Sequence, residues 1–181
     1  MKQVLLYLGN STSSSETIYH FLENENIVYT TVEDQDLNHK IEALFTEENK
    51  RGNISTKFPF NFILFKDMNK EEVFAFISKS QHLNLSHKAM LTENNIHWTL
   101  EALLKEIEEE QQYFLSYQTT MNLLKEANAL DPKDYSEESY IHYRNAFLNA
   151  YIMSKNQKCD KATLDALNSE MLKTKANLIK L

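Results

Sequence analysis

A stretch of about 33 residues without glycine or proline, from Trp98 to Leu130, limits the folds open to this chain of 181 residues. Most of its residues are strong helix formers, so it predicts one helix of roughly 50 Å at about 1.5 Å per residue. Such a helix is longer than a small domain is wide. We therefore expect its first half to close one domain and its second half to open another, with the helix fixing the angle between them.

The composition excludes several classes of protein. Two glycines and two prolines argue against loop-rich or disordered chains. The net charge of −7 argues against nucleic acid or an anionic membrane as a partner. Cys159 is the single cysteine, so no internal disulfide framework is expected. Neither a signal peptide nor an apolar run of membrane-spanning length is recognisable, and we expect a cytoplasmic protein.

The first part of the chain alternates apolar runs with helical patterns. Strands are expected at 3–8, 27–32, 60–65 and 87–92. Helices are expected after the serine-rich loop, after Asp34, after Asn69 and from Trp98, with a loop over 46–59. The helix after Asp34 is expected to carry Leu37 and Phe45 on one stripe. This order predicts an α/β domain over 1–112, with two βαβα units and a four-stranded, mostly parallel sheet.

The two units resemble each other at an offset of 59 residues. Val4 and Leu5 match Ile63 and Leu64, and the segment 41–45 matches 100–104. Internal duplication explains this similarity, but the shared pattern of any two βαβα units explains it as well. Both interpretations stay open at the level of sequence.

The last part of the chain carries three amphipathic patterns joined by short connections. After the long helix, Pro132 ends the first pattern, Asp134 or Ser136 can cap the second, and Asp160 can cap the third. Apolar residues recur at spacings of three and four in each pattern. We therefore expect an all-α antiparallel three-helix bundle over 113–181, joined to the α/β domain by the shared helix.

Residues 62–112 resemble a bacterial domain family of unknown function. The family segment has the form leucine-threonine-x-x-asparagine-x-x-tryptophan-threonine-leucine, and Leu91, Thr92, Asn95 and Trp98 stand at its positions here. The resemblance implies no activity. In physical terms, Asn95 can fold a turn through its side chain, and Trp98 is expected to be a buried anchor on the sheet.

The C-terminal region resembles the FIVAR module, a small three-helix domain of Gram-positive bacteria. The resemblance rests on Asp134-Tyr135-Ser136, on Ser139-Tyr140, and on the later alanine and leucine positions. Tyr140 stands where the family usually has tryptophan, and it is expected to anchor the same pocket. Family members are regarded as binding or spacer elements, so the resemblance implies no catalysis.

The motifs of catalysis and of metal binding are missing from the sequence. The six histidines form no HExxH pattern, and paired cysteines are lacking, so no metal site is expected. Cys159 has no histidine nearby in sequence and is expected to be an incidental thiol. The acidic run over 106–110 is expected to be a solvated helix face.

One loop could hold an anion. It follows the first strand, precedes a helix, and contains Gly9, Asn10, Ser11, Thr12, Ser13 and Ser14. Ligands of open α/β sheets bind at the carboxyl ends of strands, and helix N-termini attract anions. A plain capping loop explains the same residues.

Two functions therefore remain open. The first is a non-enzymatic protein-interaction or scaffold protein, without a cofactor, that binds a protein partner, with a homo-oligomer as a further option. The alternative is a small-molecule or phosphate- or nucleotide-binding α/β protein that uses the loop from Gly9.

Overall fold

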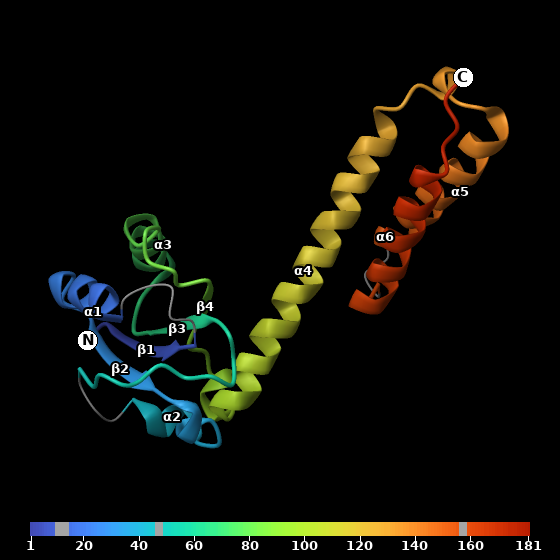
Figure 1. Ribbon diagram of the computed structural model, residues 1–181. Coiled ribbons are helices and arrows are strands. Elements are labelled where there is room, and N and C mark those ends of the chain that lie inside the picture. The colour runs from blue at the N-terminus through green and yellow to red at the C-terminus, as the bar shows by residue number, and fades with distance from the viewer. Residues whose placement is uncertain (10–14, 46–48, 156–158) are drawn as a thin grey trace. The chain divides into compact units, whose positions relative to one another are not determined.

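The computed structural model describes residues 1–9, 15–45, 49–155 and 159–181, which form two compact units (Figure 1). Unit 1 is Met1–Ile107 and unit 2 is Glu108–Leu181, close to the predicted division after residue 112. The predicted uninterrupted helix is confirmed as α4 (Leu100–Asn128), which contributes residues to both units.

Unit 1 contains a four-stranded sheet in the order β2-β1-β3-β4. The strands are β1 (Gln3–Leu8), β2 (Val28–Val32), β3 (Asn61–Lys66) and β4 (His87–Met90). β1 and β2 are parallel, as are β3 and β4, whereas the central pair β1 and β3 is antiparallel. The predicted α/β fold is confirmed, with the antiparallel pair where the two βαβ units meet.

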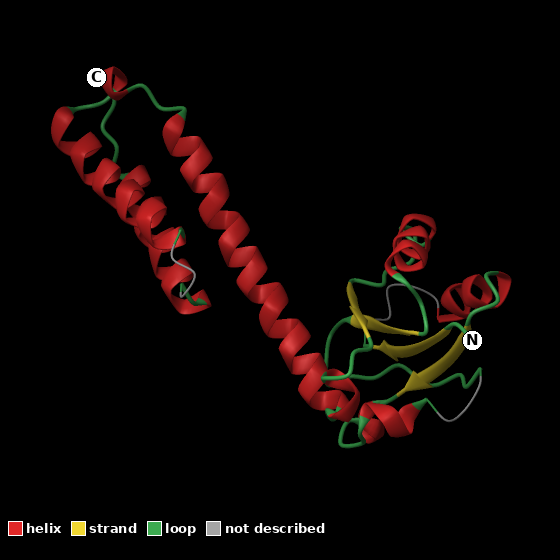
Figure 2. Ribbon diagram, turned by 180° about the vertical axis from the view of Figure 1, so that it is seen from behind, coloured by secondary structure: helices red, strands yellow, loops and turns green. Residues whose placement is uncertain are grey.

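Helices cover both faces of this sheet (Figure 2). The helices α1 (Ser15–Asn24) and α3 (Lys70–Lys79) pack on one face, while α2 (Ile41–Leu44) and the start of α4 pack on the other. Side chains alternate between the two faces, so Val4 and Leu6 enter one core while Leu5 and Tyr7 enter the second. Because both faces are buried, the strands appear in the sequence as continuous apolar runs.

The helix expected after Asp34 is shorter than predicted. The chain forms a 3₁₀ turn (Asp34–Asp36), becomes extended at Lys40, and then forms only the four-residue helix α2. The reason is a tertiary contact, because the backbone N–H of Ile41 donates to the oxygen of Trp98 at 3.0 Å. A helix continuing through Lys40 would have bonded this N–H within itself.

The two βαβ units of unit 1 have the same strand registers. Gln3 pairs with Val28 in the first unit, and Phe62 pairs with His87 in the second, so both pairs are offset by the same 59 residues. Leu5 lies directly opposite Leu64, its own equivalent. The segments before α2 and α4 exchange reciprocal bonds, since Ile41 N donates to Trp98 O and Leu100 N donates to His39 O. This arrangement is the one that duplication of a single βαβ unit predicts.

Unit 2 packs three helices around one core. They are α4, α5 (Glu137–Ser154) and α6 (Lys161–Ala176). The 3₁₀ turn Asn95–His97 precedes α4, and the 3₁₀ turn Pro132–Asp134 joins α4 to α5. Ser116 contacts Asp165 and Glu126 contacts Lys175, so α4 and α6 run in the same direction. α5 runs antiparallel to both, as expected for three helices joined by short connections (Figure 1).

Candidate functional site

Of the predicted anion loop, the structure describes Gly9. The other five residues lie outside the described residues: Asn10, Ser11, Thr12, Ser13 and Ser14. The Gly9 N–H donates to the oxygen of Phe60 at 3.1 Å. A Cβ atom on Gly9 would lie 1.8 Å from the oxygen of Phe58. The chain's own segment 58–60 therefore requires glycine here. An anion site on this loop stays a prediction.

Next to Gly9, a polar cluster ties the segment 55–58 to the ends of β1 and β2. The Tyr7 hydroxyl donates to Asp34 Oδ1 at 2.6 Å and accepts from the N–H of Phe58 at 3.1 Å. The other carboxylate oxygen, Asp34 Oδ2, accepts from the N–H and the hydroxyl of Thr56 at 2.9 and 3.1 Å. Asp34 thus satisfies several donors of a loop that lies about twenty residues further along the chain.

The electrostatics of this cluster favour a charged Asp34 and a neutral Tyr7. Burial, together with the hydrogen bond to Asp34, raises the pKa of Tyr7 to about 12. Burial works against ionisation of Asp34, but hydrogen bonds from Tyr7, Thr56 and Lys57 outweigh it and lower the pKa of that carboxyl. Neither group has a pKa suited to proton transfer at neutral pH. The role of this pair is therefore structural, and its hydrogen bonds hold the loop in place.

A second cluster is centred on Arg51, in the segment after α2. Its guanidinium donates to Glu16 at 2.8 Å, to Glu23 at 2.9 Å and to the hydroxyl of Tyr29 at 3.2 Å. The same group lies 5.0 Å from the ring centre of Tyr19. The hydrogen bond from Arg51 lowers the pKa of Glu23. These contacts attach the segment around Arg51 to α1 and β2.

Sequence reasoning missed both clusters. Tyr7 lies inside an apolar run, and its partner Asp34 is 27 residues away. Arg51 lies in a stretch with the pattern of a surface loop, 35 residues from Glu16. No local pattern in the sequence could have paired them.

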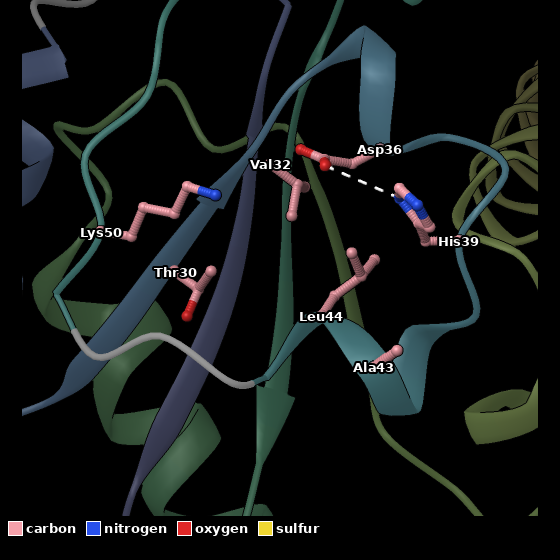
Figure 3. Close-up of a pocket in the computed structure, with 7 residues that line it drawn as sticks. All are labelled: Thr30, Val32, Asp36, His39, Ala43, Leu44 and Lys50. Atoms are coloured by element: carbon pink, nitrogen blue, oxygen red, sulfur yellow. Dashed lines mark ion pairs between the residues drawn. The ribbon is translucent and has the colours of Figure 1, made fainter.

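A hollow lies between β2 and α2 (Figure 3). Thr30 and Val32 of β2 line it, together with Asp36, His39 and Lys50. Its volume of about 190 Å³ is below the roughly 300–1,000 Å³ of ligand pockets. Asp36 Oδ1 lies 3.8 Å from His39 Nδ1, while Asp36 Oδ2 accepts from the N–H of Glu33 at 2.9 Å. The carboxylate thus closes a backbone turn beside an exposed imidazole.

A hollow of about 400 Å³ lies in unit 2, beside the start of α5 and the end of α6. The Ser136 hydroxyl donates to the Ser139 hydroxyl at 2.8 Å. Ser139 Oγ in turn accepts from the N–H of Ile179 at 3.1 Å. These hydroxyls fasten the C-terminal segment to α5, which is a structural role.

Of the predicted anchors, Asn95 and Trp98 act differently from each other. Asn95 Oδ1 accepts from the N–H of Thr92 at 2.8 Å, and Asn95 Nδ2 donates to the oxygen of Met90 at 3.0 Å. The expectation that Trp98 is a buried anchor is wrong, since its side chain is 39% exposed. The backbone of Trp98 makes the connection instead, through its oxygen and the N–H of Ile41.

The predicted anchor of unit 2, Tyr140, is half-buried and packs against the core of the bundle. Its ring stacks on that of Tyr135 with centres 6.5 Å apart. Cys159 is buried in the same core, and burial raises the pKa of its thiol. A buried thiol with a raised pKa is a poor nucleophile.

The described residues contain no group of three or more His, Cys, Asp or Glu side chains placed to hold a metal ion. Likewise, none of the helices in the described ranges is both long enough and apolar enough to cross a membrane.

One helix of unit 2 exposes an apolar surface. Ile141, Leu148 and Ile152 of α5 are 46%, 40% and 65% exposed. Their spacings of seven and four residues place them on one side of the helix, and Asn145 lies between them. We refer to these four residues as the α5 stripe. Tyr143 and Ala150, which face the core, are on the opposite side.

Comparison with known families adds one finding to this geometry. A family model described as a domain of unknown function (DUF3783) matches residues 61–114. The match begins at β3 and ends within α4, so it contains the second βαβ unit with Asn95 and Trp98. The predicted uncharacterised domain over 62–112 is thereby confirmed. Neither curated proteins nor solved structures yield a match to this chain.

Proposed function

We propose that the protein acts by binding another protein, without catalysing a reaction, and that unit 2 is its binding module. The observation that carries this proposal is the α5 stripe. Large apolar side chains that gather on one face of a helix are typical of surfaces that bind another protein. The spacing of Ile141, Leu148 and Ile152 matches the anchors that an amphipathic helix places in a groove or against another helix.

The resemblance of unit 2 to the FIVAR module supports the same proposal. We propose that α4, α5 and α6 form a FIVAR-like module whose core holds Tyr140 at its edge. The role implied for such modules is binding or spacing, which agrees with a stripe outside the core. Under this proposal the domain of unknown function in unit 1 carries the binding module.

Capture of partners by the full-length protein tests this function. The protein is immobilised and exposed to an extract of its native cell, and captured proteins are identified by mass spectrometry. Each candidate is then purified and titrated by calorimetry. The double variant Ile141→Asp/Ile152→Asp is expected to bind at least about tenfold more weakly, because the carboxylates would be buried at the contact.

The matched control is Phe74→Asp, which adds a carboxylate to α3 in unit 1 at a side chain that is 69% exposed. This variant is expected to bind like the unchanged protein. Circular dichroism confirms that every variant is folded. Binding that the double variant retains in full contradicts the proposal, as does turnover of a substrate by the purified protein.

A further inference from the structure

We propose that the edge strand β4 binds an extended segment of a partner protein, which adds a strand parallel to β4 and places a carboxylate beside Lys88. Addition of a strand to an open sheet edge is a recurring mode of peptide recognition. This surface belongs to unit 1 and is separate from the α5 stripe. The first half of unit 1 supplies the template, because there the chain itself provides the added segment.

The first half covers its own edge strand, β2. After α2 the chain returns along β2, where Lys50 forms a parallel bridge with Thr30, and the N–H of Thr31 donates to the oxygen of Lys50 at 2.8 Å. Arg51 then extends over the face that carries Tyr29, and its Nε donates to the hydroxyl of that tyrosine at 3.2 Å. The last four residues of β2 are buried.

β4 is the equivalent strand of the second half and forms the other edge of the sheet (Figure 1). All of its residues, His87–Met90, are partly exposed. The second half has no returning segment, because residues 108–111, which are equivalent to 49–52, lie within α4. The two edges therefore differ in their cover, although their strands share one register.

The backbone groups that would bond an added segment are open at β4. The N–H of Leu91 donates to the oxygen of Phe65 in β3 at 2.8 Å, and the backbone groups of successive residues in a strand point to alternate sides. Lys88 and Met90 therefore direct their N–H groups away from β3. Within the described part of the chain, neither of these N–H groups has a hydrogen-bond acceptor. Met90 is the equivalent of Thr31, whose N–H is bonded to the returning chain.

Lys88 determines the chemistry of the expected partner. It stands where the first half has Tyr29, and a hollow of about 400 Å³ lies beside it, formed with the end of α3 and the connection to β4. Lys88 Nζ donates to the oxygen of Leu85, and burial lowers the pKa of the ammonium. Among the described residues that line this hollow there is no aspartate or glutamate, and His82 is the other ionisable side chain. A carboxylate of the partner would supply the missing counter-charge.

The template also sets the register of the partner. Its residue opposite Ala89 directs its side chain to the α2 face of the sheet, as Lys50 does, and the next residue directs its side chain to the α3 face. An aspartate or glutamate at this second position would reach Lys88. A second copy is disfavoured as the occupant, because two-fold pairing of β4 strands would bring two Lys88 side chains onto one face of the joined sheet.

Hydrogen exchange of the free full-length protein, followed residue by residue by NMR, tests whether the edge is open. The N–H of Met90 is expected to exchange at least about tenfold faster than that of the equivalent Thr31. Ala89, whose N–H points toward β3, is the internal control and is expected to exchange slowly. Slow exchange at Met90 would show that the edge is already covered, by this chain or by a second copy, and would overturn the inference.

Selection of a library of random-sequence peptides on the immobilised full-length protein tests the partner. The enriched peptides are expected to share an aspartate or glutamate and to slow the exchange of the Met90 N–H. Lys88→Met is expected to weaken their binding at least about tenfold in calorimetry. The matched control is Lys70→Met, at an exposed lysine that begins α3, and it is expected to leave binding unchanged.

Charge reversal and the α5 stripe supply the remaining arms of the test. Selection on Lys88→Glu is expected to enrich peptides with lysine or arginine instead, and circular dichroism confirms that each variant is folded. The double variant Ile141→Asp/Ile152→Asp is expected to bind the acidic peptides like the unchanged protein.

A selection that enriches no peptide overturns the inference, as does binding that depends on the α5 stripe and not on Lys88. Both results leave the proposed function standing. Peptides that bind without slowing exchange at Met90 overturn the added strand, and enrichment without acidic residues overturns the role of Lys88.

Discussion

The β1–α1–β2 half and the β3–α3–β4 half of unit 1 share strand registers and closing turns, but the chain takes a different path after each half. Both halves turn after their last strand and begin a helix at equivalent residues, Ile41 and Leu100. In the first half the helix ends after four residues, and the chain then pairs with β2 through Lys50. In the second half the helix continues for 29 residues into unit 2.

This difference explains why equivalent positions carry different residues. Gly9 is equivalent to Met68 at the offset of 59. The segment 58–60, part of the returning chain of the first half, passes against Gly9 and leaves no space for a side chain. Met68 has no such restriction and buries its side chain in the core. The path of the chain after the repeated unit, and not the unit itself, decides whether a side chain fits.

Replacing Gly9 is expected to have the largest effect. Gly9→Ala places a Cβ atom 1.8 Å from the oxygen of Phe58, and a backbone atom cannot move aside as a side chain can. We expect a loss of free energy of unfolding above the about 1–3 kcal/mol typical of overpacking, or a unit 1 that fails to fold. Urea denaturation followed by the fluorescence of Trp98 measures this effect in unit 1.

The matched control for Gly9 is Gly52→Ala. Its Cβ would lie 3.0 Å from a methyl group of Thr31, so a shift of a few tenths of an ångström would relieve the contact. The control is expected to cost much less than Gly9→Ala. Equal losses for the two variants would show that the crossing segment yields easily, and the explanation given for Gly9 would be wrong.

The first residues of α2 and α4 test whether the equivalence of the halves is also energetic. Ile41 and Leu100 are both fully buried in the same core. Ile41→Ala and Leu100→Ala are each expected to lower the free energy of unfolding of unit 1 by about 3 kcal/mol, from lost burial and the cavity left behind. The same denaturation experiment measures both variants.

Leu172→Ala serves as their control, because Leu172 is half-exposed in unit 2 and should leave the transition of unit 1 unchanged. If Ile41→Ala cost less than about 1 kcal/mol while Leu100→Ala cost the full amount, the short helix would contribute little despite its burial. The two halves would then be equivalent in geometry alone.

The closing turns are expected to give the smallest effect. Asn95 and Asp36 hold equivalent positions, and each accepts from the backbone N–H three residues earlier. Only Asn95 also donates, to the oxygen of Met90. We expect Asn95→Ala to cost about 2 kcal/mol and Asp36→Ala to cost about 1 kcal/mol, the difference being the additional hydrogen bond.

Asn95→Asp separates the two contributions, because it keeps the acceptor and removes the donor to Met90. Its loss of stability, measured by urea denaturation, should fall between those of the two alanine variants. A cost for Asp36→Ala equal to or greater than that for Asn95→Ala would show that the additional hydrogen bond does not distinguish the turns.

Local signals in the sequence were sufficient for most of the elements. The apolar runs predicted the four strands, and the absence of glycine and proline predicted α4. Asn69 and Asp160 cap helices as expected, accepting from the N–H groups of Glu72 and Thr163. These features depend on residues within a few positions of each other, so the sequence carries them directly.

The tertiary structure alone decided how the elements meet. It set the antiparallel pairing of the two βαβ units, the shortening of α2, the exposure of Trp98 and the contacts of Tyr7 with Asp34. It also showed that Gly9 is required by the segment 58–60 of the same chain. Apart from the exposure of Trp98, each of these features joins residues about twenty-five or more positions apart. Their contacts arise only when the returning chain packs on the sheet, so neither local propensity nor side-chain periodicity contains them.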